Sequence, residues 1–406
     1  MLHVHIGPSP LALGLLIPAT LDAGMSVGVI GRPGDKSPLV YVFSGSGPDG
    51  FADLHRVDWF EGPNVFGDLP NDLRGRIESD EPLLLTCTLR KAIAERRALI
   101  EEILESRPDH AETILLACEN APDPVYSEIV TKFTGRAGFQ CLQTVVNRMC
   151  IGRKSDSKGR RVVSAHPLGE WLIAEPAADS AFLEALSQVD EVSVVSDIEA
   201  RHDRKLWMVN GAHQALAVMA WAAGLAELRI PGKLGEEPSD DLRRAAEDGR
   251  VIGRLSHIHT SMNAALRSKY PELEDSLDYG LEHVQAYGEH PDSIRRVLEA
   301  FKRGDLGPFI KTLDLRLAVP ARICFEMGIP VSPYSLIFDL FEDLVGDLDA
   351  FMDTKRVRRD PSLVTREADH FAVSQYRIML TGWMDEAEAN ERLKRFTKAL
   401  VASRPW

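Results

Sequence analysis

Short apolar runs and longer amphipathic segments alternate along the first 150 residues of the chain. The apolar runs have the length and composition of buried strands, and they cover residues 2–6, 26–30, 83–87, 113–118 and 139–146. Residues 41–44 and 52–59 are predicted as two further extended segments, joined by a glycine-rich turn. Helical patterns fill the remaining spaces, over residues 11–23, 90–105 and 125–133. Alternating strands and helices predict a parallel sheet with helices on its faces.

From about residue 197 onward the pattern is helical. Helices are predicted over residues 243–267, 273–287, 293–301, 370–382 and 385–403. The expected fold class is therefore α/β, with a parallel sheet in residues 1–197 followed by a mostly α-helical domain in residues 198–406.

One stretch departs from the amphipathic pattern, because residues 206–226 contain no charged side chain. Three polar groups lie near its start, on Lys205, Asn210 and His213. At about 100° per residue, an α-helix would direct them to about 0°, 140° and 80°, so that one side presents an amine, an amide and an imidazole. The run is also compatible with a transmembrane helix, or with a core helix whose polar residues are structural. Its polar interruptions, and the lack of another membrane-spanning pattern, favour a helix inside a large core.

The first predicted strand ends in a turn that contains glycine, Gly7-Pro-Ser-Pro-Leu-Ala-Leu-Gly14, and a helix and a second strand follow. In a Rossmann-type domain this turn holds a dinucleotide pyrophosphate on the helix N-terminus. The candidate cofactor-binding residues here are Gly7, Ser9, Ala12 and Gly14. Ser9 and Ala12 stand where the G-x-G-x-x-G fingerprint has glycine, and two prolines remove N–H donors from the loop. The turn is compatible with a dinucleotide loop and with a plain strand-to-helix connection.

In such folds, the residue at the end of the second strand determines whether NAD or NADP is preferred. An acidic residue there binds the ribose 2′-hydroxyl of NAD, whereas an arginine favours the 2′-phosphate of NADP. This chain has Arg32 after Gly31 and no acid directly beside it. The expected cofactor is NAD or NADP, and Arg32 favours NADP unless it is only a solvated turn residue.

Polar residues also follow two other predicted strands. Glu119 and Asn120 come after residues 113–118, and Asn147 and Arg148 end the run of residues 139–146. Ligands of parallel sheets gather at the carboxyl ends of the strands, which makes these four residues candidates for a binding site. Taken singly, each is more typical of an ordinary turn residue.

In the helical half, Lys311 and Arg316 are candidates for contacting a substrate phosphate or carboxylate, although isolated basic residues are usually solvated. His257 and His259 lie two apart in a predicted helix, so they do not face one metal ion. Structural or solvent-facing roles are expected for both histidines.

Composition excludes several classes of protein. The formal charge of −14 and the pI near 5.4 argue against a nucleic-acid-binding surface. The five cysteines are an odd number without CxxC spacing, which indicates reduced thiols and no zinc site. The N-terminus lacks the basic and apolar regions of a signal peptide. We therefore expect a cytoplasmic protein with no membrane partner and no metal.

Five motifs occur in order along the chain, namely Gly7…Gly14, Ala117-Cys-Glu-Asn120, Val145-Val-Asn-Arg-Met149, Gly169-Glu-Trp-Leu-Ile173 and Lys205-x4-Asn210-x2-His213. Together they resemble the mannitol dehydrogenase family of long-chain polyol dehydrogenases, and the length is closest to the mannitol-1-phosphate branch. The resemblance runs from residue 1 to about residue 220 and continues more loosely over residues 308–330. The lysine helix together with the Ala-Cys-Glu-Asn strand end is specific, whereas the glycine loop is not.

The resemblance implies an NAD(P)-dependent oxidoreductase that interconverts a polyol, or a polyol phosphate, and the corresponding keto sugar. Residues 1–197 would bind the dinucleotide and residues 198–406 the small-molecule substrate, in a monomer or homodimer. Lys205 would be the general base or acid, Asn120 and Asn210 would hold the developing alkoxide, and His213 would bind substrate hydroxyls. Such chemistry needs no metal ion.

Three departures from the family pattern keep an alternative open. Asn147 stands where the family usually has aspartate, and Ser9 and Leu13 replace a glycine and an arginine of its phosphate loop. The acidic residue that would bind the ribose 2′-hydroxyl of NAD is absent. A family member that has lost cofactor binding and acts as a sugar-binding or regulatory protein is the alternative that these departures suggest.

Overall fold

The computed structural model describes residues 1–31, 39–43, 57–60, 65–89, 92–118, 124–153, 161–225, 241–273, 276–289, 306–346 and 366–402. The chain divides into two compact units, Met1–Arg201 and His202–Trp406. This division falls within helix α6 (Ile198–Arg204), four residues after the boundary expected from the sequence.

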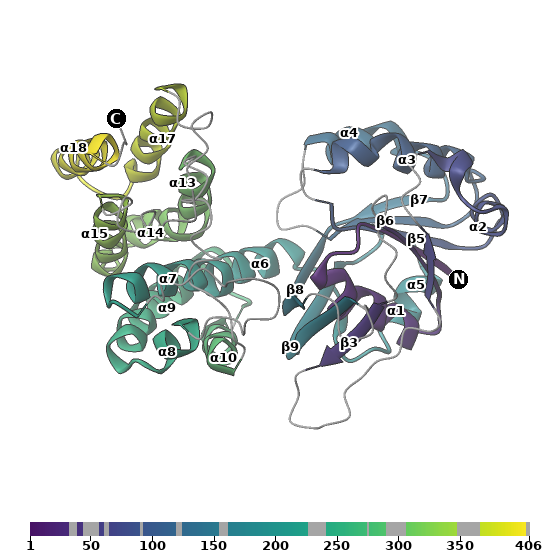
Figure 1. Cartoon of the computed structure of the whole chain (residues 1–406), viewed down its shortest axis with the longest axis horizontal. Helices are drawn as coiled ribbons and strands as arrows, with labels where there is room; N and C mark the ends of the chain where they lie inside the picture. The colour runs from purple at the N-terminus through teal and green to yellow at the C-terminus, as the bar shows by residue number, and fades with distance from the viewer. Residues whose placement is uncertain are drawn as a thin grey trace. The chain divides into compact units, whose positions relative to one another are not determined.

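A parallel sheet forms the centre of the first unit (Figure 1). Among the described residues it has six strands, in the order β4 (Val57–Phe60), β2 (Ser26–Ile30), β1 (Leu2–Ile6), β5 (Leu83–Cys87), β6 (Thr113–Ala117) and β7 (Phe139–Leu142). Each neighbouring pair is parallel. The strand β3 (Leu39–Phe43) belongs to another sheet. Without it, this is the 3-2-1-4-5-6 order of doubly wound dinucleotide-binding sheets, so the predicted fold class is confirmed.

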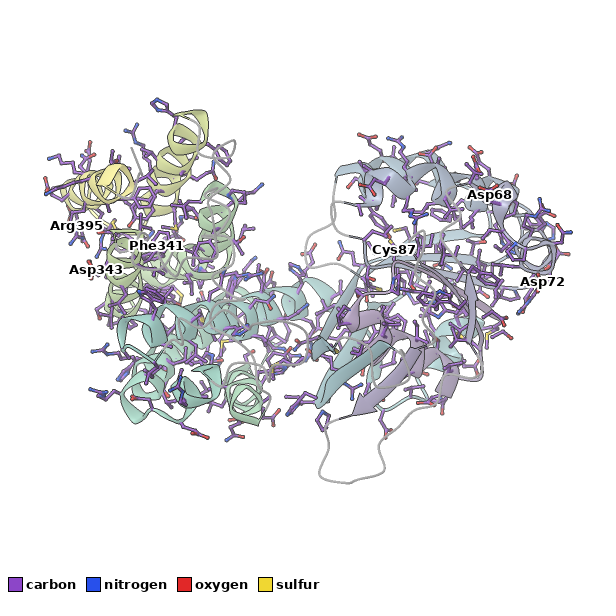
Figure 2. All side chains as sticks on the ribbon, viewed as in Figure 1. Asp68, Asp72, Cys87, Phe341, Asp343 and Arg395 are labelled. Atoms are coloured by element: carbon purple, nitrogen blue, oxygen red, sulfur yellow. The ribbon has the colours of Figure 1, made fainter. Side chains whose placement is uncertain are left out.

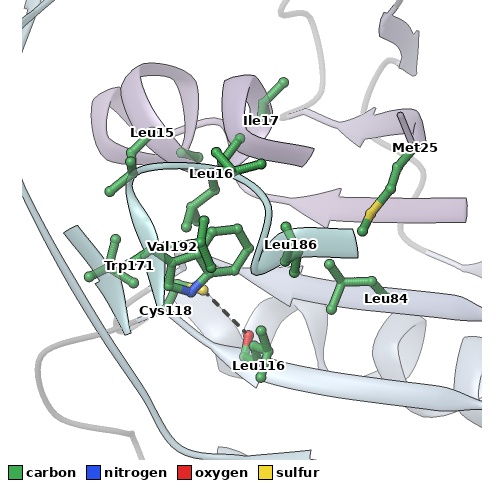
Figure 3. Close-up of a cluster of buried hydrophobic side chains, with 14 of the residues drawn as sticks. Leu15, Leu16, Ile17, Met25, Leu84, Leu116, Cys118, Trp171, Leu186 and Val192 are labelled. Atoms are coloured by element: carbon green, nitrogen blue, oxygen red, sulfur yellow. Dashed lines mark hydrogen bonds between the residues drawn. The ribbon is translucent and has the colours of Figure 1, made fainter. Parts of the chain in front are cut away.

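The two faces of this sheet are covered differently. Leu2, Val4 and Ile6 of β1 join the core under α2 (Asn71–Ile77), α3 (Ile93–Ser106) and α4 (Pro124–Phe133). The opposite face packs against a π-helical segment, η1 (Ala12–Leu16), and the helix that continues it, α1 (Ile17–Asp22). Figure 3 shows part of this second core, where Leu15 and Leu16 lie near Trp171. Because strand side chains alternate, His3 and His5 belong to this second face.

A second sheet, absent from the sequence prediction, completes the first unit. Its strands are β3 (Leu39–Phe43), β8 (Thr144–Arg153), β9 (Arg161–Ala174) and β10 (Val192–Val195), and β8 runs antiparallel to β9. The expectation of one strand over residues 139–146 is wrong, because the chain leaves the first sheet after Leu142 and enters the second at Thr144. A helix, α5 (Ala181–Leu186), precedes β10.

The second unit is helical. In addition to α6, its described elements are η4 (Lys205–Gly211), α7 (Ala212–Ala222), α8 (Asp241–Glu247), α9 (Gly249–Lys269), α10 (Ser276–Glu289), α13 (Gly307–Leu313), η5 (Asp314–Ala318), α14 (Val319–Glu326), α15 (Ser332–Gly346), α17 (Arg366–Leu380) and α18 (Glu386–Ala402). Aromatic rings form its core around Phe341, labelled in Figure 2, whose ring centroid lies 5.9 Å from Phe309 and 6.1 Å from Phe396.

One long helix was predicted over residues 243–267, and this prediction is wrong. The helix is interrupted at Asp248, whose carboxylate accepts hydrogen bonds from the N–H groups of Arg250 and Val251 at 2.9 and 3.1 Å. Such an N-cap starts a new helix, α9. The predicted helix over residues 293–301 lies outside the described residues. No described helix is both long and apolar enough to cross a membrane.

Candidate active site

The lysine stretch is one continuous helix with a π-helical segment in its middle. Residues of α6 precede η4, and α7 follows it without a break. The N–H of Ala212 donates to the carbonyl of Trp207, five residues earlier, where an α-helix would use Met208. Because i→i+5 bonds close the turn, the angle between Lys205 and Asn210 around the helix axis is smaller than the 140° expected from α-helical geometry, and the two side chains lie nearer to one face.

Burial differs among the three polar residues of this face. Lys205 is 7% exposed, whereas Asn210 and His213 are half-buried. The following helix α7 is buried along nearly its whole length, as expected for a core helix. The helix thus combines a sheltered amine with an amide and an imidazole that solvent can still reach.

A second π-helical segment, η5, crosses this helix at a glycine. A Cβ atom on Gly211 would lie 2.7 Å from the carbonyl oxygen of Arg316 and 3.4 Å from its Cβ. Only glycine permits so close an approach without a shift of the η5 backbone. The crossing places Arg316, which is half-buried, next to the segment that carries Asn210. Lys311 is exposed on α13 and has no such contact with Gly211.

His259, for which only a structural or solvent role was expected, secures the π-helical turn. Its Nε2 lies 3.0 Å from the carbonyl oxygen of Met208, the group from which the π register diverts the N–H of Ala212. Burial lowers the pKa of His259 to about 4, so the neutral ring donates from Nε2 to this carbonyl. The sequence carried no signal for this contact, because it depends on the unexpected π turn.

Residues just before Lys205 anchor the helix to α9 and α10. The carboxylate of Asp203 accepts from Lys269 Nζ at 2.7 Å and from the Tyr270 hydroxyl at 2.9 Å. The guanidinium of Arg204 stacks on the ring of Tyr279 at 3.8 Å. Burial opposes ionisation of Asp203, but its hydrogen bonds outweigh burial and lower its pKa. These contacts limit rotation of the helix around Lys205.

In the first unit, the turn after β1 depends on two glycines. Gly7 has φ +90°, and a Cβ there would lie 2.6 Å from a methyl carbon of Leu89. A Cβ on Gly14 would lie 2.6 Å from the sulfur of Cys150, so glycine allows close packing of the helix on the second sheet. Ser9 caps the helix, because its Oγ accepts from the N–H of the buried Ala12 at 3.1 Å. The residues present fit a dinucleotide at this edge, at the point where the strand order reverses.

The end of β2 carries a basic residue that the sequence did not reveal. Arg96, from α3, is 6% exposed, and its Nη2 donates to the carbonyl of Gly31 at 3.1 Å. Its charge thus lies at the strand end where cofactor choice is made. No local pattern in the sequence marks this contact, because its partner is 65 residues away. Arg32 lies outside the described residues.

The structure does not place the other four predicted strand-end residues at the edge of the parallel sheet. Glu119 and Asn120 lie outside the described residues, beyond β6. Asn147 and Arg148 do not end a strand of the parallel sheet but lie inside β8, where Asn147 is paired with Glu170. Arg148 Nε donates to the carbonyl of His166 at 2.7 Å, so its buried side chain braces two strands. Burial lowers the pKa of Arg148.

All five cysteines are free thiols. In the described parts of the chain, no group of His, Cys, Asp or Glu side chains is arranged to hold a metal ion.

A scan against protein-family models gives no match. The chain is 22% identical over 313 residues to a mannitol-1-phosphate 5-dehydrogenase of Caldanaerobacter subterraneus, covering 73% of this chain and 72% of the relative. Its fold matches that of Pseudomonas fluorescens mannitol 2-dehydrogenase, solved as a ternary complex with NAD and D-mannitol, with a TM-score of 0.61 at 11% identity over 98% of this chain and 91% of that one. A substrate-free D-sorbitol dehydrogenase matches with a TM-score of 0.64 at 14% identity, over 98% and 94% of the two chains. The chain is therefore a homologue of a mannitol-1-phosphate 5-dehydrogenase with the fold of the mannitol and sorbitol dehydrogenases, and the family resemblance indicated by its motifs is confirmed.

Proposed function

We propose that the protein is an NAD(P)-dependent dehydrogenase that interconverts a polyol, or a polyol phosphate, and the corresponding keto sugar, with Lys205 as general base. The observation that carries the proposal is the π-helical turn η4, which aligns the sheltered amine of Lys205 with the amide of Asn210. The named relatives act on mannitol-1-phosphate, mannitol and sorbitol, which is the chemistry that this pair of groups suits.

Polyol oxidation removes a hydroxyl proton while a hydride leaves the same carbon. The neutral amine of Lys205 accepts the proton, and in the reverse direction the ammonium returns it. Asn210 donates its amide N–H to the developing alkoxide, a contact whose loss costs on the order of 10²–10³ in rate. Asn120 is proposed as the second donor and His213 as a ligand of neighbouring hydroxyls. The nicotinamide, when bound, supplies the hydride acceptor.

Arg316 is the proposed contact for a phosphorylated substrate. Its backbone packs against Gly211, so its side chain starts beside the lysine face, and a guanidinium matches the geometry of a phosphate. The exposed Lys311, and Asn147 and Arg148 of β8, remain proposed substrate contacts on the strength of the family motifs alone.

NADP is the proposed preferred cofactor. Arg96 brings a positive charge to the carboxyl end of β2, and Arg32 follows the same strand in sequence. Such a charge strengthens binding of the 2′-phosphate of NADP, whereas it adds little to binding of the free 2′-hydroxyl of NAD. Gly7 and Gly14 would hold the pyrophosphate end of either nucleotide.

A substrate panel tests the proposal. Mannitol, sorbitol, their phosphates and hexuronates are each offered with NAD and with NADP, and the reduced cofactor is followed by its absorbance. Turnover of at least one polyol or polyol phosphate is expected, with NADP preferred. Saturable sugar binding without nucleotide binding would instead support the non-catalytic alternative, which is motivated by Pro8, Pro10 and Ser9 in the glycine loop.

A further inference from the structure

A chain of hydrogen-bonded side chains runs through the core of the first unit and ends at the glycine loop. Thr20 of α1 lies 2.8 Å from Nδ1 of His3, whose Nε2 lies 2.7 Å from the hydroxyl of Thr86. The same hydroxyl lies 2.6 Å from Nδ1 of His5, whose Nε2 lies 3.0 Å from the carbonyl oxygen of Gly7. All four side chains are fully buried. Such a polar chain inside an apolar core is costly unless every group is satisfied.

Both histidines are neutral at physiological pH. Burial lowers the pKa of His3 well below its ordinary value, and it lowers the pKa of His5 to about 4. A neutral imidazole donates from one nitrogen and accepts at the other. If one nitrogen of a ring accepts a hydrogen bond, the other nitrogen must therefore donate one, so all the hydrogen bonds in the chain point the same way.

The carbonyl of Gly7 sets this direction, because it can only accept. His5 must carry its proton on Nε2, so its Nδ1 accepts from the Thr86 hydroxyl. The oxygen of Thr86 then accepts from His3 Nε2, and His3 Nδ1 accepts from Thr20. The proton of Thr20 thus goes to His3, although the Ile17 carbonyl also lies 3.0 Å from its hydroxyl. The opposite direction would leave a lone pair of His5 Nε2 facing the carbonyl. The Thr88 hydroxyl, 3.2 Å from the same nitrogen, could not satisfy that lone pair, because its proton goes to the Gly7 carbonyl.

The end of this chain is the peptide group that begins the glycine loop. The Gly7 carbonyl also accepts from the hydroxyl of Thr88, after β5, and from the N–H of Ser9 at 2.8 Å. Pro8 and Pro10 have no N–H with which the loop could hold itself. Side chains from the sheet therefore donate hydrogen bonds to the loop, in place of backbone N–H groups that a loop without prolines would have.

We propose that the Thr20–His3–Thr86–His5 chain is a positioning device for the dinucleotide loop, which fixes the orientation of the Gly7–Pro8 peptide from inside the core. The proposal rests on the proposed function, since it assumes that the loop binds a nicotinamide nucleotide. His3 and His5 are positioning residues and touch no nucleotide themselves.

Two matched variants separate positioning from stability. Thr86→Val breaks the chain in its middle, next to His5, whereas Thr20→Val removes the same kind of buried hydroxyl at the far end. Binding of NADPH and NADH is followed by nucleotide fluorescence, and thermal unfolding of each variant is recorded. We expect Thr86→Val to bind about ten-fold more weakly than the wild type, and Thr20→Val to stay within about two-fold, at similar losses of stability. Equal affinities of the two variants would overturn the positioning role alone, whereas no nucleotide binding by the wild type would overturn the proposed function as well.

The tautomers give an independent test that does not depend on how the variants fold. Ring ¹⁵N resonances of His3 and His5, assigned with His3→Gln and His5→Gln variants, should show the Nε2–H tautomer for both and no titration between about pH 5.5 and 8. An Nδ1–H tautomer at His5, or titration of either ring in this range, would overturn the proposed hydrogen-bond chain.

Discussion

The two units bring polar groups to their candidate sites by different means. In the first unit the strand order itself places the ends of β1, β2 and β5 at one edge, and the π-helical segment η1 only fits the helix onto the second sheet. In the second unit nothing in the helical topology singles out Lys205. There a single π-helical turn, braced by Gly211 and His259, aligns the side chains. The candidate site of the first unit depends on the strand order, so it should keep its geometry after local substitutions. The candidate site of the second unit depends on one irregular turn, so local substitutions should disturb it.

Removal of the amine is expected to have the largest effect. Lys205→Ala should lower kcat by about 10²-fold or more, because the hydroxyl proton loses its acceptor, while nucleotide affinity stays unchanged. Steady-state rates and fluorescence titration measure the two quantities. Lys394→Ala, at an exposed position of α18, is the control and should keep full activity. Unchanged turnover in Lys205→Ala would remove this residue from the mechanism.

The crossing at Gly211 should be nearly as sensitive. Gly211→Ala places a methyl group 2.7 Å from the backbone oxygen of Arg316, so η4 and η5 must move apart. We expect a loss of about 1–3 kcal/mol in the free energy of unfolding, together with reduced kcat. Gly253→Ala in α9 is the matched control, because nothing lies within 4 Å of its added carbon. That variant should gain about 0.5–1 kcal/mol from helix propensity, and equal behaviour of the two variants would refute the close crossing.

Buried histidines predict a pH dependence in both units. His5 and His259 have a pKa of about 4 in the folded protein against an ordinary value of 6.5, so the unfolded chain binds more protons between these values. The free energy of unfolding should therefore fall as the pH is lowered through this window, by up to about 1.4 kcal/mol per pH unit for each ring. Denaturant titrations at several pH values should show a smaller slope for His259→Gln than for a variant of the exposed His110. Identical slopes would place His259 in a solvated setting.

The smallest expected effect concerns the edge of the first unit. Arg96→Gln should lower the affinity for NADPH relative to NADH by about ten-fold, since one charged contact to a phosphate is lost. Its neighbour Arg97 is half-buried and paired with Glu101 and Glu128, so Arg97→Gln is the control. A preference for NADPH that survives in Arg96→Gln would assign the choice of cofactor to other residues.

The sequence allowed prediction of the parallel sheet because most of its strands are short, largely apolar runs separated by helical patterns. It did not allow prediction of the second sheet, since no glycine or proline marks the change of sheet at Gln143 and the partners of β9 lie far apart in the chain. The break at Asp248 was accessible in principle, because Asp followed by Gly is a common helix boundary.

The residues of the candidate site were accessible through their types and spacing, but their geometry was not. A π-helical turn uses the same residues as an α-helix, so only the tertiary contacts of Gly211 and His259 reveal that Lys205 and Asn210 align. Arg96 and the His3–His5 chain were hidden for a related reason. Each acts through a partner on another element, and no local pattern records such pairs.

Chemical rescue tests the central claim, that the amine of Lys205 accepts the substrate proton. Small primary amines such as ethylamine are added to Lys205→Ala at several pH values, with nucleotide and polyol saturating. The account predicts that the rate rises in proportion to the concentration of neutral amine, and that the wild type and Lys394→Ala do not respond. A folded, nucleotide-binding Lys205→Ala enzyme that no amine of any size or pH reactivates would contradict the assignment of Lys205 as the base.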